Sequence, residues 1–179
     1  LMITFPIKAF ALIEVDITRG NLNPLPLAVS PLSIDDKSKK SFEKILKKEN
    51  IGSEISTIVE NNLRTSGLFN PLSKEAFLQA PDIANLKPRF EDWNLIKAQA
   101  LITGKVTYVD EKLRVEFRLW DVLAAKEMMA LAFTTVPNNW RRVGHIISDK
   151  VYERLTGEKG YFDTRIIYVA EEGPKTQRK

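Results

Sequence analysis

Cysteine is absent from this chain of 179 residues. Disulfide bridges, thiol nucleophiles and cysteine-ligated zinc are therefore excluded. Histidine is nearly absent as well, since His145 is the only one. A dedicated zinc site needs three or four protein ligands, so His145 with its neighbour Asp149 is too few for one. The sequence predicts no bound metal and no thiol chemistry.

Motifs of the common enzyme classes are also missing. The chain has no G-x-S-x-G nucleophile elbow, no phosphate-binding glycine loop and no dinucleotide fingerprint. His145 could in principle form a Ser–His–Asp catalytic triad with Ser148 or Ser56 and with Asp149. A catalytic site needs several groups that converge on one point, and the sequence gives no sign of this. We therefore interpret His145 as a surface or packing residue of a helix. The paired carboxylates Asp35-Asp36 and Glu171-Glu172 lie in polar loops, where solvation gives no reason for a shifted pKa. We therefore predict no catalytic residues, no cofactor and no enzymatic activity.

Long apolar runs are lacking too. The apolar amino terminus, Leu1–Leu12, is interrupted by Pro6 and Lys8 and is far too short to span a bilayer. It contains Ala9-Phe10-Ala11, a pattern that signal peptidase accepts. We interpret residues 1–11 as the remnant of a secretory signal peptide that is cleaved after Ala11. The alternative is a buried amino-terminal strand, because a short apolar run is ambiguous.

What the chain does contain is typical of one globular domain. Apolar residues make up 44% and charged residues 28% of the sequence, and the net charge is +4. The length suffices for one domain with a sizeable core and is too short for two ordinary ones. The mild net positive charge does not by itself indicate nucleic-acid binding, because nucleic-acid-binding proteins concentrate their basic residues on one face.

Lysine is concentrated in the segment Asp35–Asn50. Three apolar residues, Phe42, Ile45 and Leu46, recur there with the spacing of a short amphipathic helix. We interpret the segment as a solvated helix that buries these three residues. The alternative is a patch for an anionic membrane or a nucleic acid. The lysines concerned are Lys37, Lys39, Lys40, Lys44, Lys47 and Lys48.

Apolar periodicity and turn residues predict the remaining elements. Helices are expected at Ser53–Ser66 with Ser53 as the cap, at Phe90–Gln99 and at Asn138–Thr156, with a helical turn at Ser73–Gln79. Strands are expected at Ile13–Thr18, Leu27–Val29, Leu68–Leu72, Leu101–Val109, Leu113–Val122 and Met128–Val136. Loops are expected at Arg19–Pro26 and between Gln79 and Phe90.

The last three strands and the helix after them carry the clearest patterns. In Leu113–Val122, apolar and charged residues alternate, which marks a sheet with one wet face, and the connections have hairpin length. The three tryptophans are interpreted as core or sheet residues, but Trp120 falls on the polar side of its strand and is a candidate for a contact surface. We predict a two-layer α/β fold with a mixed sheet and helices packed on one face. The following helix is expected to dock through Trp140, Val143, Ile147, Val151 and Leu155.

Four segments, in order, resemble the amino-terminal domain of the TolB family. The long helix, Asn139–Asp149 followed by Tyr152–Gly157, resembles the helix that closes that domain, and Thr164–Val169 resembles the strand after it. Ser66–Leu72 is similar to the family's S-G-x-F-N-P-L. Trp93 with Ile102–Val106 is similar to its W…V-x-G-x-V stretch. Glu14–Ile17 matches the start of the mature family proteins.

The resemblance implies a fold similar to the anticodon-binding domain of class II synthetases and a place in the periplasm. It implies a domain at residues 12–162, with residues 163–179 as the start of a β-propeller or a linker. In the family the propeller binds the lipoprotein Pal, and the mature amino terminus is linked to binding TolA. The implied TolA-contacting residues are Leu12, Ile13, Glu14, Val15, Asp16, Ile17 and Thr18.

The expected function is thus that of a monomeric protein-interaction module of the Tol–Pal system. The module would help to maintain outer-membrane integrity and envelope constriction at cell division, would be peripheral to the membrane at most and would not bind nucleic acid. Two alternatives remain open. One is a nucleic-acid-binding module of the anticodon-binding type, and the other is a periplasmic activator domain of a cell-wall synthase. The second is disfavoured because such lipoproteins begin with a cysteine.

Overall fold

The segment with the strongest alternation lies in the middle of a mixed sheet. The computed structural model describes residues 23–164. Its long strands β4 (Ala100–Val109), β5 (Lys112–Asp121) and β6 (Lys126–Thr135) pair as the predicted antiparallel meander. Val115, Phe117 and Leu119 of β5 are buried, whereas Arg114 is exposed, so the wet face is where the alternation predicts it.

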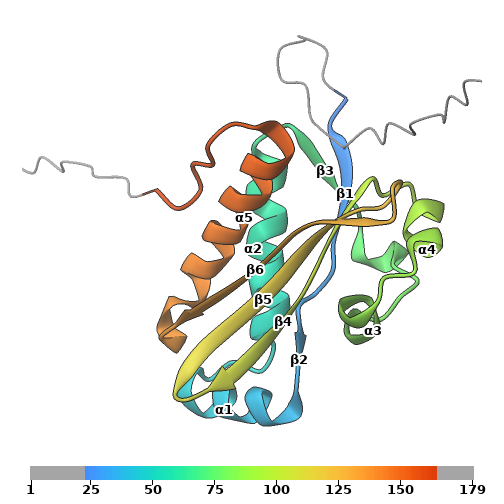
Figure 1. Ribbon diagram of the computed structural model, residues 1–179. Coiled ribbons are helices and arrows are strands. Elements are labelled where there is room, and N and C mark those ends of the chain that lie inside the picture. Colours follow the sequence, from blue (N-terminus) through green and yellow to red (C-terminus); the bar gives the residue numbers. More distant parts are fainter. Residues whose placement is uncertain (1–22, 165–179) are drawn as a thin grey trace, which may run out of the picture.

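Three short strands complete the sheet with parallel pairings. β1 (Leu25–Val29) lies between β3 (Phe69–Pro71) and β4, and β2 (Ser33–Ile34) also pairs with β4. The sheet has six strands, and its main order is β3-β1-β4-β5-β6 (Figure 1). The predicted α/β class with a mixed sheet is confirmed. The predicted loop at Arg19–Pro26 is wrong at its end, because Leu25 and Pro26 already belong to β1.

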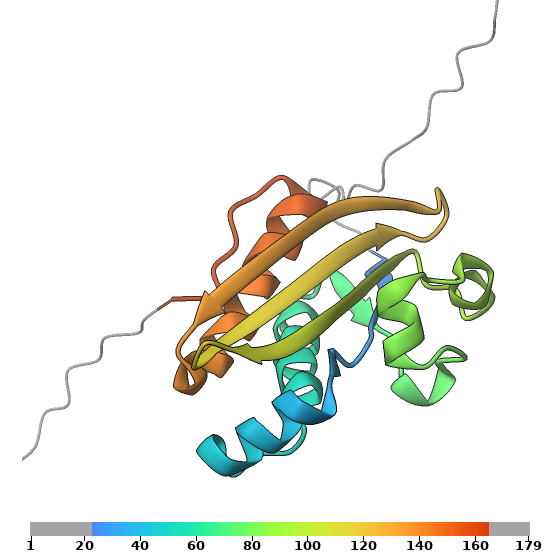
Figure 2. The same cartoon turned by 60° about the horizontal axis from the view of Figure 1, so that its bottom comes forward.

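Two long helices cover one face of the sheet and form the main core. They are α2 (Ile51–Thr65) and α5 (Trp140–Thr156), the latter preceded by a 3-10 turn, η2 (Pro137–Asn139). All five residues of the predicted apolar stripe of α5 are buried. Gly144 lets the two helices approach closely, since a Cβ there would lie 2.8 Å from Ile58 Cγ2. Figure 2 shows the helices along one side of the meander.

A smaller layer on the other face was not predicted. It contains a 3-10 turn, η1 (Lys74–Ala76), and two short helices, α3 (Pro81–Leu86) and α4 (Phe90–Leu95). These elements cover a second apolar cluster built around Trp93, Leu101 and Val122. The segment expected as a loop after Gln79 therefore holds α3, and the helix expected to reach Gln99 ends at Leu95.

Trp120 belongs to this second cluster rather than to a free contact surface. Its indole Nε1 donates to Thr103 Oγ1 at 2.9 Å, and its ring meets Phe90 edge-on at 5.8 Å between centroids. The sequence placed it correctly on the polar side of β5, but α4 covers that side at this end of the sheet. The alternation of a strand cannot show which part of the outer face a distant helix covers.

The lysine-rich segment forms α1 (Asp36–Leu46), as predicted. Only Phe42 of its three apolar residues is fully buried, and Ile45 remains 45% exposed, so the prediction that all three are buried is wrong. α2 begins at Ile51, two residues before the expected cap Ser53. Ile51 lies in the main core. No helix within residues 23–164 is long and apolar enough to cross a membrane.

Candidate protein interface

The predicted TolA-contacting segment, Leu12–Thr18, lies outside the described residues. The structure does place the strand to which it leads. β1 is an interior strand, with Leu25 beside Phe69 of β3 and Leu27 beside Ala100 of β4. The backbone N–H of Leu25 donates to Leu68 O at 2.9 Å. The described chain therefore begins at a strand that has neighbours on both sides, at the end of the sheet where β4 starts.

The two edges of the sheet differ in how open they are. β3 is only three residues long and contains Pro71, two features that limit pairing with another strand. β6 is ten residues long and, among the described strands, pairs only with β5. An edge with free backbone donors and acceptors can add a strand from a partner. The sequence predicts β6 as a strand, but nothing in its pattern distinguishes an edge strand from an interior one.

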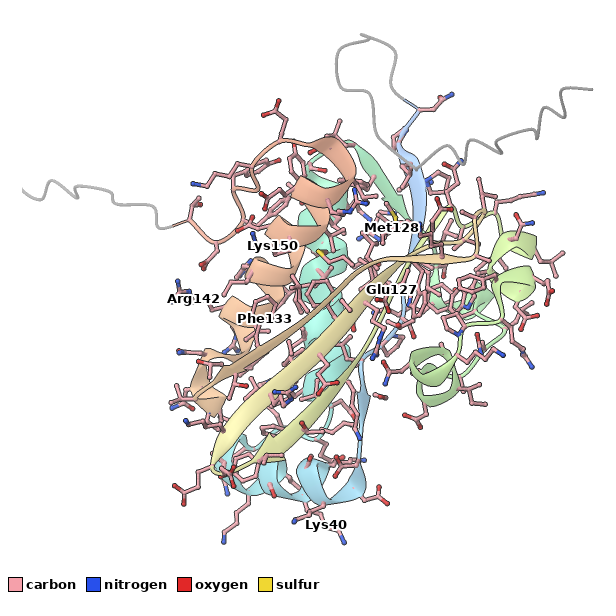
Figure 3. All side chains as sticks on the ribbon, in the orientation of Figure 1. Lys40, Glu127, Met128, Phe133, Arg142 and Lys150 are labelled. Carbon is pink, nitrogen blue, oxygen red and sulfur yellow. The ribbon has the colours of Figure 1, made fainter. Side chains whose placement is uncertain are left out.

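β6 itself contributes no charged side chain beyond its start, although Arg154 of α5 donates to Met128 O at 3.4 Å. From Met128 to Thr135 the strand has no charged side chain, and Leu131 is 37% exposed. Phe133 is half-buried and stacks on Phe117, with 6.0 Å between ring centroids. Figure 3 shows Met128 and Phe133 along β6, beside α5. Charged or shortened edges are the usual protection against unwanted pairing, so this edge is suited to protein contact.

His145 is held in a contact between the two long helices. The side-chain amide of Asn62 in α2 lies 2.9 Å from His145 Nδ1 and donates to Ser148 Oγ at 2.9 Å. Ser148 Oγ in turn donates to Gly144 O at 2.8 Å. The interpretation of His145 as a packing residue agrees with this geometry, because its ring nitrogen bonds across the helix pair.

The other residues of the possible triad point to different partners. Asp149 accepts the backbone N–H groups of Phe162 and Asp163, at 2.6 and 3.1 Å, and so fixes the chain after α5. Ser56 Oγ accepts from Leu32 N, and its single proton is within 3.0 Å of two backbone acceptors, Ser30 O and Gly52 O, measured from Oγ. These side chains serve backbone hydrogen bonds and do not converge on His145. Within residues 23–164 no three acidic, histidine or cysteine side chains are placed to hold a metal ion.

Asp35 has a bond that the sequence reasoning missed. Its carboxylate accepts the backbone N–H of Ser38 at 2.9 Å and the Ser38 hydroxyl at 3.0 Å, which caps α1. The backbone bond from Ser38 is the main reason that the pKa of Asp35 lies below its usual value of 3.8. The expectation of an ordinary pKa is therefore wrong. An Asp that comes just before a helix is the signal that could have predicted the cap.

Comparison with known proteins identifies the family. The profile of the TolB amino-terminal domain matches residues 13–128. The Tol-Pal system protein TolB of Pelagibacter ubique (strain HTCC1062) is 86% identical over 178 residues, which cover 99% of this chain and 40% of that protein. The crystal structure of TolB from Acinetobacter baumannii has the same fold, with a TM-score of 0.63 and 22% identity over 85% of this chain and 33% of that one. The chain thus spans 40% of the length of its curated relative. The chain belongs to the TolB amino-terminal domain family.

Proposed function

We propose that this chain is a non-enzymatic protein-interaction domain of the Tol–Pal system and that it acts in the periplasm. The observation that carries the proposal is the 86% identity to a protein named for that system, which extends over nearly the whole chain. In this function the domain contacts TolA. It thereby helps to maintain outer-membrane integrity and envelope constriction at cell division. Binding of Pal is assigned to the propeller that residues 163–179 would begin.

The contact with TolA is assigned to Leu12–Thr18. The segment alternates apolar and polar residues, as in a strand with two different faces. Val15 and Ile17 would face a groove of the partner, while Glu14 and Asp16 would face water or a basic rim. Strand addition uses backbone hydrogen bonds for affinity and alternate side chains for register. A segment that orders only on binding gives reversible contact, because ordering costs conformational entropy.

The structure supports this assignment through the position of β1. Both long sides of β1 are already paired, with β3 and with β4, so the described sheet has no gap beside this strand. Leu25, Leu27 and Val29 of β1 lie in the main core. A partner can therefore engage residues upstream of β1 without separating strands of the described sheet.

A deletion pair tests the proposal. Removing Leu12–Thr18 should abolish binding to the carboxy-terminal domain of TolA, measured by calorimetric titration, and should barely change the melting temperature. Ile17→Pro should act in nearly the same way, because proline removes a ladder donor. The matched control removes Gly173–Lys179, a polar segment of the same length, and should leave binding intact. Unchanged affinity after the first deletion would refute the assignment. A large fall in melting temperature would instead identify the segment as a strand of the domain itself.

A further inference from the structure

α1 carries a row of lysines on one face. Lys37, Lys40 and Lys44 follow each other at intervals of three and four residues, which places them on one side of the helix. Lys47 comes three residues later as the C-cap residue, in the left-handed conformation, directly after the helix. All four are exposed. The opposite side of the helix holds the buried residues Ser38 and Phe42. The row is about 15 Å long, at 1.5 Å per residue.

These lysines have no carboxylate partner in the described part of the chain. Elsewhere, basic side chains form ion pairs, such as Arg64 with Glu60 at 2.7 Å and Arg142 with Asp163 at 3.1 Å. None of the four lysines in the row forms an ion pair within residues 23–164, although Asp36 and Glu43 flank the row. Their positive charge is therefore available to an external anion.

The row lies on a helix that packs against one end of the sheet. Phe42 is fully buried and meets Tyr108 edge-on at 5.5 Å, and Ser38 Oγ accepts the backbone N–H of Tyr108 at 2.8 Å. Tyr108 is near the end of β4, whereas Leu27 of β1 lies beside its start. α1 is therefore at the opposite end of the sheet from the start of β1, and Figure 3 shows Lys40 pointing away from the body.

Two residues near the row differ in what they add to it. Lys48, just after α1, lies 5.2 Å from the centre of the Trp140 ring, but its ammonium group is paired with Glu54 at 2.7 Å. Arg141 lies 4.2 Å from the same ring and forms no ion pair within residues 23–164, so it adds positive charge at the start of α5. Ile45 follows Lys44 in the sequence, lies between the lysine face and the buried side of the helix, and is 45% exposed. An exposed apolar side chain beside lysines suits the boundary between lipid headgroups and acyl chains.

We propose that the lysine face of α1, formed by Lys37, Lys40, Lys44 and Lys47 with Ile45 beside it, binds the surface of an anionic phospholipid bilayer. Lysine ammonium groups are mobile point charges that suit a diffuse layer of phosphates, whereas specific carboxylate or phosphate recognition favours the fork of arginine. The only aromatic residue of α1, Phe42, is buried, so the helix offers no platform on which a nucleic-acid base could stack. Charge complementarity thus favours the bilayer. The proposal goes beyond the contact with TolA and does not depend on it.

The experiment measures binding of the full chain to lipid vesicles. Vesicles of equal parts phosphatidylglycerol and phosphatidylcholine are compared with pure phosphatidylcholine by co-sedimentation. Binding should be confined to the anionic vesicles and should be lost between about 0.01 M and about 1 M salt, as the screening length shortens. The variant with Lys37, Lys40, Lys44 and Lys47 all changed to Gln should bind at least about tenfold more weakly. Replacement of the same four by Arg should keep the binding, because the charge is retained.

The matched control removes the same charge elsewhere. Four other lysines are exposed and form no ion pair within the described residues: Lys87, Lys112, Lys126 and Lys159. Their joint replacement by Gln should leave vesicle binding within about threefold of that of the unchanged chain, because a bilayer attracts only those charges that lie close to its own surface. Circular dichroism melts show that each variant is folded. Equal losses in the two Gln variants, or equal binding to both kinds of vesicle, would overturn the proposal. Tighter binding of polyglutamate or of a single-stranded oligonucleotide than of anionic vesicles would assign the face to a different class of partner. Because TolA is not used in this experiment, failure of vesicle binding can be distinguished from failure of the proposed contact with TolA.

Discussion

Individual side chains decide how α1 is attached to the sheet. Asp35 is exposed, yet its carboxylate holds both the backbone N–H and the hydroxyl of Ser38. The same hydroxyl accepts the N–H of Tyr108 in β4. A capping bond and a bond to the sheet thus share one oxygen atom, which fixes the first turn of α1 relative to the meander.

Replacement of Asp35 by Ala should cost about 1 kcal/mol of unfolding free energy at neutral pH, as is usual for loss of a helix cap. The pKa of Asp35 is lowered in the folded state, so its contribution is present above the usual value of 3.8 and is lost as the pH falls through the lower, folded-state pKa. The difference between the unchanged chain and the variant should therefore shrink in strong acid. Urea titrations at neutral and acidic pH measure this difference in unfolding free energy. Asp36→Ala, which removes the neighbouring carboxylate, serves as the control and should have a smaller effect.

Ile147 is the central residue of the apolar stripe of α5 and is 1% exposed. Ile147→Ala should reduce the unfolding free energy by about 2–5 kcal/mol, because it removes buried methyl groups and leaves a cavity. Lys150→Ala, one turn away on the exposed side, removes only a surface pair with Glu153 and should be nearly neutral. Denaturant titrations compare the two variants. Similar losses in both would mean that the helix docks through a different face.

At the scale of elements, the least expected feature is the α3–α4 layer. It is organised around Gln79, which is 4% exposed. Its amide donates to Lys87 O at 3.1 Å, and its carbonyl oxygen accepts Arg89 N–H and Trp93 Nε1–H, each at 3.0 Å. One buried polar side chain thus joins the end of α3, the start of α4 and the largest residue of the second cluster. A lone glutamine between loop residues carries no such signal in the sequence.

Gln79→Met keeps a similar volume but removes all three hydrogen bonds. It should cost about 1–3 kcal/mol, because buried donors and an acceptor are left without partners. The loss should be local, with faster backbone hydrogen exchange in residues 77–96 and little change in α2 and α5. Gln99→Met is the control, since the side chain of Gln99 forms no hydrogen bond within the described residues. Equally rapid exchange throughout the domain would show that the layer is not a separate unit of stability.

At the scale of the whole chain, the given sequence spans 40% of the length of the TolB protein of Pelagibacter ubique that it matches. The start of β1, to which the proposed TolA-contacting segment leads, and α1 lie at opposite ends of the sheet. A partner and a bilayer could therefore be bound at the same time.

The predicted export belongs to this scale, because it would decide where the protein acts. Mass spectrometry of the natural protein recovered from the periplasm should show a mature start at Leu12, or one or two residues later, since Ala9-Phe10-Ala11 is the cleavage pattern. Recovery of protein from that compartment with Leu1–Ala11 still attached would contradict the prediction. These residues lie outside the described part of the chain.

The sequence alone was sufficient to predict the helices and strands whose apolar pattern repeats over many residues. The ten-residue strands β4, β5 and β6 and the seventeen-residue helix α5 bury one face along their whole length, so their periodicity is strong. Family-specific motifs such as Ser66–Leu72 also lie within single segments, and for that reason the family could be inferred from residues alone.

Only the tertiary structure decided the features that depend on contacts between distant segments. Gln79 forms hydrogen bonds with the end of α3 and the start of α4. Asp35 binds Ser38, whose hydroxyl accepts a hydrogen bond from β4. Trp120 is covered by α4, a helix that precedes its strand in the sequence. β6 is an edge because of the order in which strands pair, and the lysine row of α1 is accessible because only Phe42 and its neighbours on the other side meet the sheet. Local patterns report which side of an element is apolar. They do not report which neighbour meets that side, since this depends on how all the elements pack together.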